Sequence, residues 1–144
     1  MPRLNDPFNT PIEDDEPQTR TQPVTWAANP DQDNAKDAAN YLGLITGKKN
    51  TKRIIDDLAN AQLVTYKAKD VLRAANLPPL STSNPRVQLA LTLIAAGTPL
   101  APIYLVRGKM GKGLPLTIAD GYHRTSAAWS IDPGADIAAF IVSA

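Results

Sequence analysis

The chain has 144 residues, a formal net charge of +1 and 43% hydrophobic residues, which fits one small globular domain. It contains no cysteine, which excludes disulfides, cysteine–zinc sites and a thiol nucleophile. No window approaches about 18 uninterrupted apolar residues, and the opening MPRLNDPFNT lacks the apolar core of a secretory signal. We therefore expect a cytoplasmic protein with no membrane partner.

Charge is distributed unevenly along the chain. Residues 1–33 carry seven acidic side chains against two arginines, so this segment has a net charge of −5. The rest of the chain carries thirteen lysines or arginines against seven acidic residues, which gives a net charge of +6. This asymmetry is consistent with an anionic partner for the basic body. Alternatively, the acidic segment serves solubility and lies over the basic face.

Residues 1–33 are predicted to form a disordered acidic arm, because they hold six of the thirteen prolines and few aliphatic residues. Trp26 is the exception, and we expect this aromatic side chain to dock on the folded body. Residues 34–62 are predicted to form a helical hairpin. Its apolar side chains recur at helical spacing, and they are Ala38, Tyr41, Leu42 and Ile45 in the first helix and Ile54, Ile55, Leu58 and Ala61 in the second.

Residues 63–144 alternate between strand and helix patterns, which predicts an α+β fold. The predicted elements are a strand over 63–66, helices over 71–75 and 85–96, strands over 102–107 and 114–119, a helix over 121–131 and a strand over 136–142. The 102–107 strand is apolar on both faces, which predicts a central position in the sheet. The 85–96 helix is apolar on two sides, which predicts that it is largely buried.

The stretch IADGYHRTSAAW, residues 118–129, contains the only histidine and joins a predicted strand to a predicted helix. The first N–H groups of a helix lack internal acceptors, and the helix dipole adds positive potential there. Gly121 would let a ligand approach the backbone, Arg124 offers a planar fork to phosphate oxygens, and His123 can move a proton near neutral pH. The stretch predicts a phosphate site. Alternatively, Asp120 only caps the helix and pairs with Arg124 in a polar turn.

Several segments together resemble the domain shared by the ParB N-terminal region and sulfiredoxin. They are SNPRVQLALTLIAAG, PIYLVRG, LPLTIADGYHRTSAAW and ADIAAFIV, and the resemblance covers about residues 63–142. With VTYKAKDVLRAANLPPL added, the chain is similar to a group of small bacterial ParB-like proteins with no settled function. The resemblance implies a ParB/sulfiredoxin-like domain over residues 63–144, with a small mixed sheet, packed helices and nucleotide binding.

Sulfiredoxins carry Gly-Cys-His-Arg where this chain has Gly121, Tyr122, His123 and Arg124. The cysteine is replaced by tyrosine, so sulfinic acid reduction is excluded. The resemblance implies that this run, continued by Thr125, holds the phosphates of a nucleotide such as ATP or CTP.

The helix before this run also takes part in the resemblance. Arg86, near its start, matches a basic position that faces the nucleotide. Leu89 and Leu93 stand where sulfiredoxins have hydroxyl residues, which departs from the family pattern for base and ribose contacts.

ParB proteins bind CTP and usually carry Gly-Glu-Arg-Arg, so Tyr122 replaces the glutamate and His123 replaces the first arginine. About thirteen residues follow the helix, too few for helix-turn-helix and dimerisation domains, so a DNA clamp is not expected. Kinases of free serine also use this fold, which keeps small-molecule phosphoryl transfer open by fold analogy.

Three functions remain open from the sequence. The first is nucleotide binding, with ATP- or CTP-dependent phosphoryl transfer or hydrolysis as its catalytic form. In that reaction Asp120 would bind Mg²⁺ or act as a base, and His123 would position or protonate the substrate. The second is a nucleic-acid-associated module. Lys67, Lys69, Lys109 and Lys112 would contact the nucleic acid or line the mouth of the phosphate pocket; alternatively, they are solvated charges. The third is a non-catalytic protein-binding module with a degenerate pocket. For all three functions, no transition-metal site is predicted, because the chain has one histidine and no cysteine.

Overall fold

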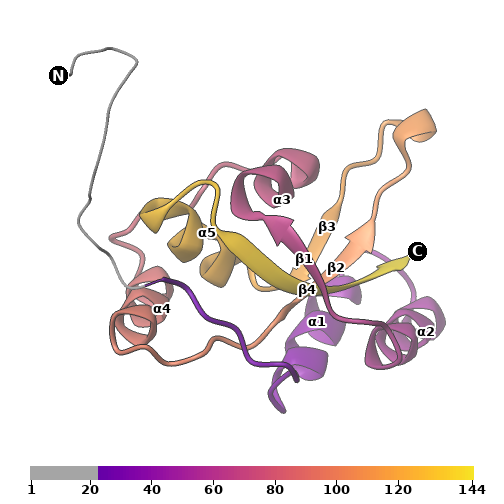
Figure 1. Ribbon diagram of the computed structural model, residues 1–144. Helices are drawn as coiled ribbons and strands as arrows, with labels where there is room; N and C mark the ends of the chain where they lie inside the picture. Colours follow the sequence, from indigo (N-terminus) through magenta and orange to yellow (C-terminus); the bar gives the residue numbers. More distant parts are fainter. Residues whose placement is uncertain (1–22) are drawn as a thin grey trace, which may run out of the picture.

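The computed structural model describes residues 23–144, and residues 1–22 of the predicted acidic arm lie outside the described residues. The described residues form five α-helices and one four-stranded mixed sheet (Figure 1), which confirms the predicted α+β class. The elements are α1 (Asn34–Leu42), α2 (Lys48–Ala59), β1 (Val64–Lys67), α3 (Ala68–Ala75), α4 (Pro85–Ala95), β2 (Ile103–Arg107), the short 3₁₀ turn η2 (Met110–Lys112), β3 (Thr117–Asp120), α5 (Tyr122–Ile131) and β4 (Asp136–Ser143).

The sheet has the strand order β1-β4-β2-β3. β2 and β4 run parallel, and the two outer strands pair with them in antiparallel fashion. Tyr104 of β2 lies opposite Phe140 of β4, and their rings meet edge to face with centroids 5.9 Å apart. β2 is buried from Ile103 to Val106, which confirms the predicted central strand.

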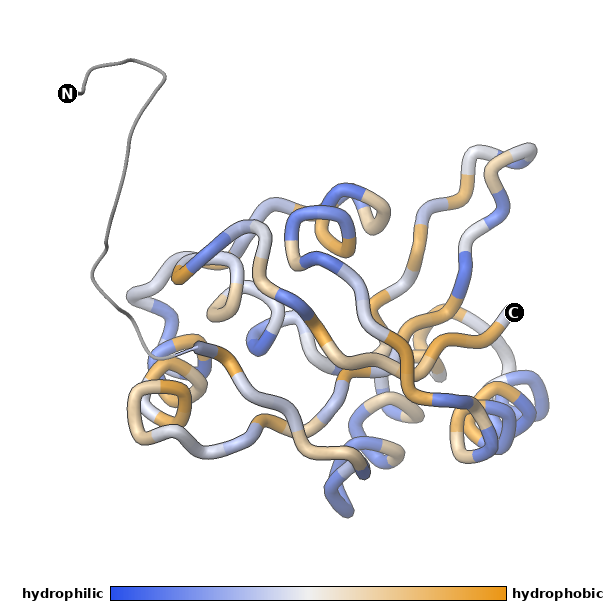
Figure 2. The backbone as a smooth tube through the Cα atoms, in the orientation of Figure 1, coloured by the Kyte–Doolittle hydropathy of each residue, from blue (hydrophilic) through white to orange (hydrophobic). Residues whose placement is uncertain are grey.

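The helices cover both faces of the sheet (Figure 1). α3 and α5 pack on the face that carries Ile103, Leu105 and Ile137. α1 and α2 pack on the opposite face, against Tyr104 and Phe140. The predicted helical hairpin therefore shares a core with the sheet. Figure 2 shows the hydrophobic residues of β2 and β4 in this middle layer.

α4 packs on α5 rather than on the sheet, through Val87, Ala90 and Ile94. Its start is the one predicted, since the Asn84 side chain accepts the N–H groups of residues 86 and 87 and a proline follows it. The prediction of a largely buried helix is wrong, however. One face of α4 stays open to solvent because only the opposite face has a partner, and the side chain of Leu89 on the open face is 61% exposed.

Residues 23–33, which the sequence assigned to the arm, are placed against the folded body, and we call this segment the strap. The N–H of Leu100 donates to the Thr25 carbonyl at 2.9 Å, and the N–H of Ala27 donates to the Leu100 carbonyl at 2.8 Å. Trp26 packs against the apolar core, and its Nε1 donates to the carbonyl of Asp136 at 2.8 Å. The expected docking of Trp26 is confirmed.

Candidate functional site

The turn between β3 and α5 begins the candidate site. Gly121 is the N-cap of α5, and its φ of 118° lies in the left-handed region that other residues rarely adopt. A Cβ atom here would lie 2.2 Å from Cγ2 of Ile103 in β2. The hydrogen side chain is therefore required for the backbone turn and for close packing of the helix start on the sheet. The expected approach of a ligand to the backbone at Gly121 stays a prediction beside this packing role.

Asp120 lies in a polar network with α1 and α5. Its Oδ2 accepts hydrogen bonds from Asn34 Nδ2 at 2.8 Å and from Arg124 Nη2 at 3.3 Å. Both donors also reach the carbonyl oxygen of Pro102, at 3.0 and 3.2 Å. The predicted pairing of Asp120 with Arg124 is confirmed. The predicted helix cap is wrong, because the left-handed Gly121 takes the cap position and the carboxylate forms no cap hydrogen bond.

The charges of Asp120 and Arg124 largely offset each other. Burial raises the pKa of Asp120, while the guanidinium of Arg124 opposes this rise. Their side chains are only 15% and 21% exposed, so the ion pair is partly shielded from water. The Nε of Arg124 is buried and has no hydrogen-bond partner among the described residues. The fold therefore fixes the position of Arg124. Its ion pair with Asp120 weakens its attraction for an anionic ligand.

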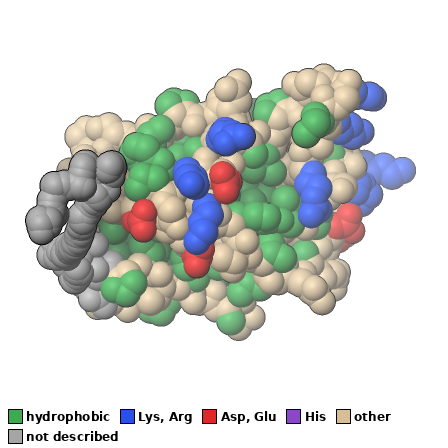
Figure 3. Space-filling view, turned by 45° about the horizontal axis from the view of Figure 1, so that its top comes forward, with side chains coloured by type: hydrophobic (Ala, Val, Ile, Leu, Met, Phe, Trp, Pro, Cys, Tyr) green, Lys and Arg blue, Asp and Glu red, His purple; other side chains and the backbone are tan. Residues whose placement is uncertain are grey.

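A pocket of about 300 Å³ opens beside this network between α4 and the start of α5, and we call it the α4–α5 pocket. Arg86 of α4 and His123 and Arg124 of α5 line it, together with Gly121 and Asp120. The structure thus brings together five of the residues predicted for the site. Another part of the lining, the apolar wall, consists of Leu89, Ala90, Leu93, Pro99, Leu100 and Ala101. Figure 3 shows a face on which Lys and Arg side chains gather at one end and mix with Asp and Glu side chains nearer the middle; no histidine is visible on it.

Tyr122 and Thr125 were also predicted for the site, but they do not line this pocket. The Tyr122 hydroxyl donates to the carbonyl of Pro78 at 2.5 Å, so the ring points away from the pocket toward the α3–α4 connection. Thr125 is fully buried, and its Oγ1 donates to the Gly121 carbonyl at 2.9 Å. The side chains of both residues therefore contact the start of α5 and its neighbours, outside this pocket, and their role in ligand binding stays a prediction.

The environment of His123 favours its neutral form. Burial lowers the pKa of His123 below its usual 6.5, and the nearby positive charges of Arg86 and Arg124 lower it further. Asp120 acts in the opposite direction. A neutral imidazole at pH 7 can donate one hydrogen bond and accept another, which suits a group that positions a ligand or moves a proton.

Two carboxylates that sequence reasoning missed also line the α4–α5 pocket, Asp31 of the strap and Asp37 of α1. One oxygen of Asp31 accepts the N–H groups of Asp33 and Asn34 at 2.9 and 3.1 Å. With Asp120, the pocket has three carboxylates and two guanidinium groups. It is therefore of mixed charge, and it suits a singly phosphorylated ligand or one that carries its own cation.

The four lysines that were considered as pocket residues lie elsewhere in the structure. Lys67 pairs with Asp136 at 2.7 Å. Lys109 and Lys112 lie in the β2–β3 connection, and none of the four lines the α4–α5 pocket.

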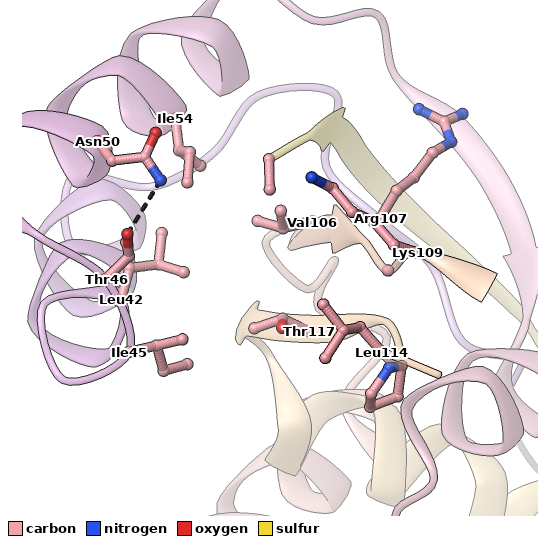
Figure 4. Close-up of a pocket in the computed structure, with 13 residues that line it drawn as sticks. Leu42, Ile45, Thr46, Asn50, Ile54, Val106, Arg107, Lys109, Leu114 and Thr117 are labelled. Carbon is pink, nitrogen blue, oxygen red and sulfur yellow. Dashed lines mark hydrogen bonds between the residues drawn. The ribbon is translucent and has the colours of Figure 1, made fainter. Parts of the chain in front are cut away.

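Lys109 instead lines a separate groove of about 420 Å³ between the α1–α2 and β2–β3 hairpins, which we call the hairpin groove. Figure 4 shows the apolar side chains that face each other across it, namely Leu42, Ile45 and Ile54 of the α1–α2 hairpin and Val106 and Leu114 of the β2–β3 hairpin.

Comparisons with known proteins add no assignment, since no family model, curated protein or solved structure matches this chain. Among residues 23–144 no group of three or more His, Cys, Asp or Glu side chains could hold a metal ion. Within the same part of the chain, no helix is both long and apolar enough to cross a bilayer. The site is therefore interpreted from its own geometry.

Proposed function

We propose that this chain binds a phosphorylated small molecule in the α4–α5 pocket. The observation that carries the proposal is the convergence of Arg86 from one helix with His123 and Arg124 from another. Arg86 has no ion-pair partner among the described residues, so its guanidinium is available for a phosphate. The first N–H groups of α5 have no acceptor within the helix and add to this attraction.

The order of elements supports a ParB/sulfiredoxin-like assignment, which we propose for residues 63–144. From β1 onward the chain runs strand, helix, helix, strand, strand, helix, strand, as the sequence resemblance implies. Members of that superfamily bind nucleotides, so ATP or CTP with Mg²⁺ is the first ligand class to test. Bound Mg²⁺ would offset the negative charge of Asp31 and Asp37.

A reaction at this pocket would be phosphoryl transfer or nucleotide hydrolysis. His123, neutral and at the pocket wall, would move the proton. Asp120 would position Arg124 rather than act as a free base, because its Oδ2 already accepts two hydrogen bonds. Sulfinic acid reduction is excluded because the chain has no cysteine.

The experiment measures binding of ATP, CTP, GTP and ADP, with and without Mg²⁺, to the wild type and to Arg86→Gln. Arg86 is exposed, so this variant should keep its fold. We expect at least about a tenfold loss of affinity for the bound nucleotide. Arg73→Gln is the matched control, since Arg73 is an exposed arginine on α3 outside this pocket. Equal affinity of Arg86→Gln and the wild type, or no binding to any phosphate compound, would contradict the proposal.

The hairpin groove supports a second candidate, a nucleic-acid-associated module. Arg107 and Lys109 line this groove and Lys112 follows in the same connection, which concentrates positive charge at one end of the sheet. Nucleic-acid binding there would weaken steeply as salt is raised. Arg107→Gln/Lys109→Gln should then reduce the salt dependence, whereas Arg86→Gln should not.

A further inference from the structure

The α4–α5 pocket has an apolar wall that phosphate binding alone does not require. Leu89 and Leu93 of α4 line this wall, and their side chains are 61% and 37% exposed. The opposite face of α4 is buried against α5. Among residues 23–144, Leu89 is thus left mostly open to solvent and Leu93 partly so. Large apolar side chains that line a pocket in this way favour a ligand with an apolar part.

The apolar wall continues directly from the cationic end of the pocket. Arg86, Leu89 and Leu93 are separated by three and four residues, so they lie on one face of α4, with the buried Ala90 at its edge. At about 1.5 Å of rise per residue, Arg86 and Leu93 are about 10 Å apart along the helix axis. A ligand with its phosphate at Arg86 would therefore lay up to about 10 Å of its body along the leucines.

The side chains of this wall offer no hydrogen bond to a ligand. The wall is made of Leu89, Ala90, Leu93, Pro99, Leu100 and Ala101, and none of these side chains is a donor or an acceptor. The polar edge of a base or the hydroxyl groups of a sugar would lose water there without a side-chain partner, which is unfavourable. An aromatic or aliphatic group would lose no hydrogen bonds.

The charge of the pocket favours a ligand with one phosphate over a ligand with several. The charge of Arg124 is offset by its ion pair with Asp120, and Asp31 and Asp37 add negative charge. Arg86 is then the main cation available to a ligand, and one guanidinium matches one phosphate group. A chain of several phosphates would be repelled by the carboxylates in the absence of a bound cation.

Resting on the phosphate site proposed above, we infer that the preferred ligand is a phosphate monoester of an apolar alcohol or phenol. Its phosphate binds at Arg86 and His123, and its aryl or alkyl group lies on Leu89 and Leu93. This narrows the ligand class from phosphorylated small molecules in general to those without hydrogen-bonding groups near the phosphate. It ranks such esters above the nucleotides, which the sequence resemblance suggests.

The test is calorimetric titration of the full chain with inorganic phosphate, phenyl phosphate and benzyl alcohol. We expect phenyl phosphate to bind at least about tenfold more tightly than inorganic phosphate, because only the ester buries an apolar group. Leu89→Gln/Leu93→Gln should reduce this preference to within about twofold and leave the affinity for inorganic phosphate unchanged. Leu44→Gln is the matched control, because Leu44 is an 85% exposed leucine outside the pocket.

The outcomes separate this inference from the proposal on which it rests. Equal affinities for inorganic phosphate and phenyl phosphate, both lost in Arg86→Gln, would overturn the apolar ester and leave the phosphate site standing. Benzyl alcohol binding as tightly as phenyl phosphate, or no effect of Arg86→Gln on either phosphate, would overturn both. If the double variant fails to fold by circular dichroism, Leu89→Gln alone replaces it, since that side chain is the more exposed of the two.

Discussion

The side chain of Asn34 joins the strap to the polar network of Asp120 and Arg124 behind the site. Its Nδ2 donates to Asp120 and to the Pro102 carbonyl, and its Oδ1 accepts the N–H of Asp31 at 2.8 Å. The residue is 1% exposed, so water cannot replace these partners. Asn34 therefore sets the position of the strap, of β2 and of Asp120 together.

Replacing Asn34 with alanine should cost about 2–3 kcal/mol of unfolding free energy, because Asp120 and the Pro102 carbonyl each lose a donor at a buried position. Urea denaturation of the full chain measures this loss. Asn40→Ala is the control, since Asn40 lies on the same helix and is exposed. A loss below about 0.5 kcal/mol for Asn34→Ala would show that the network adds nothing to stability.

His123 provides a direct reading of the pocket charge, because it is the only histidine in the chain. Its ring proton signals in NMR should titrate below 6.5, and Arg86→Gln should raise this pKa, since Arg86 is one of the groups that lower it. A bound phosphate should also raise it. Arg73→Gln should leave the titration unchanged, and an unchanged titration in Arg86→Gln would contradict the placement of Arg86 beside the imidazole.

The same lowered pKa fixes the sign of a stability effect. As pH falls below 6.5, the unfolded chain takes up a proton at His123 before the folded chain does. The contribution of His123 to stability is therefore complete above pH 6.5. It is lost as the pH falls from 6.5 through the lowered pKa of the folded chain.

At the scale of elements, the sequence predicted the order of helices and strands because each has a local signal. β2 is apolar at successive positions and is buried on both faces, and α4 begins at an asparagine and proline that specify a helix start. The error in the burial of α4 has a physical cause. An apolar pattern shows which side chains could be buried, but the packing of other elements decides which ones are, and α5 covers only one face of α4.

Only part of the candidate site could be predicted from the sequence. Gly121, His123 and Arg124 are neighbours in the chain, so their motif could be recognised locally. Asn34 contacts Asp120 across 86 positions, and Asp37 reaches the pocket from α1. Neither has a local signal, because such contacts arise only when the whole sheet has formed.

The turn into α5 should be intolerant of any side chain. Gly121→Ala should destabilise the fold by about 3 kcal/mol, because the left-handed backbone is strained for alanine and the new Cβ would overlap Ile103. Thermal unfolding measures the change. Gly111→Ala is the control, since a Cβ at Gly111 meets nothing within 4 Å. A Gly121→Ala protein as stable as the wild type would mean that the helix start can move away from the sheet.

At the scale of the whole molecule, the strap joins the first described residues to two later parts of the chain, the segment before β2 and the start of β4. It pairs with Leu100, and Trp26 reaches the start of β4 through Asp136. Because Asp31 of the strap and Leu100 both line the α4–α5 pocket, the strap also forms part of the pocket wall. Its attachment therefore affects the pocket as well as the stability.

Removing the Trp26 ring should release the strap. In Trp26→Ala the amide protons of Ala27 and Leu100 should exchange at least about tenfold faster, since their hydrogen bonds with the facing backbone would open more often. Trp26→Phe keeps most of the apolar contact and should show a smaller effect. Unchanged exchange in Trp26→Ala would show that the backbone pairing holds the strap without the ring.

Within residues 23–144, β4 is the last strand, the only strand paired with β1, and the parallel partner of β2. A ribosome therefore releases β1 and β2 long before the strand that joins them exists. Until residue 143 has left the exit tunnel, both strands expose unpaired backbone and apolar side chains, the state in which nascent chains associate wrongly. Completion of the fold, and of the pocket beside it, thus follows the synthesis of its final strand.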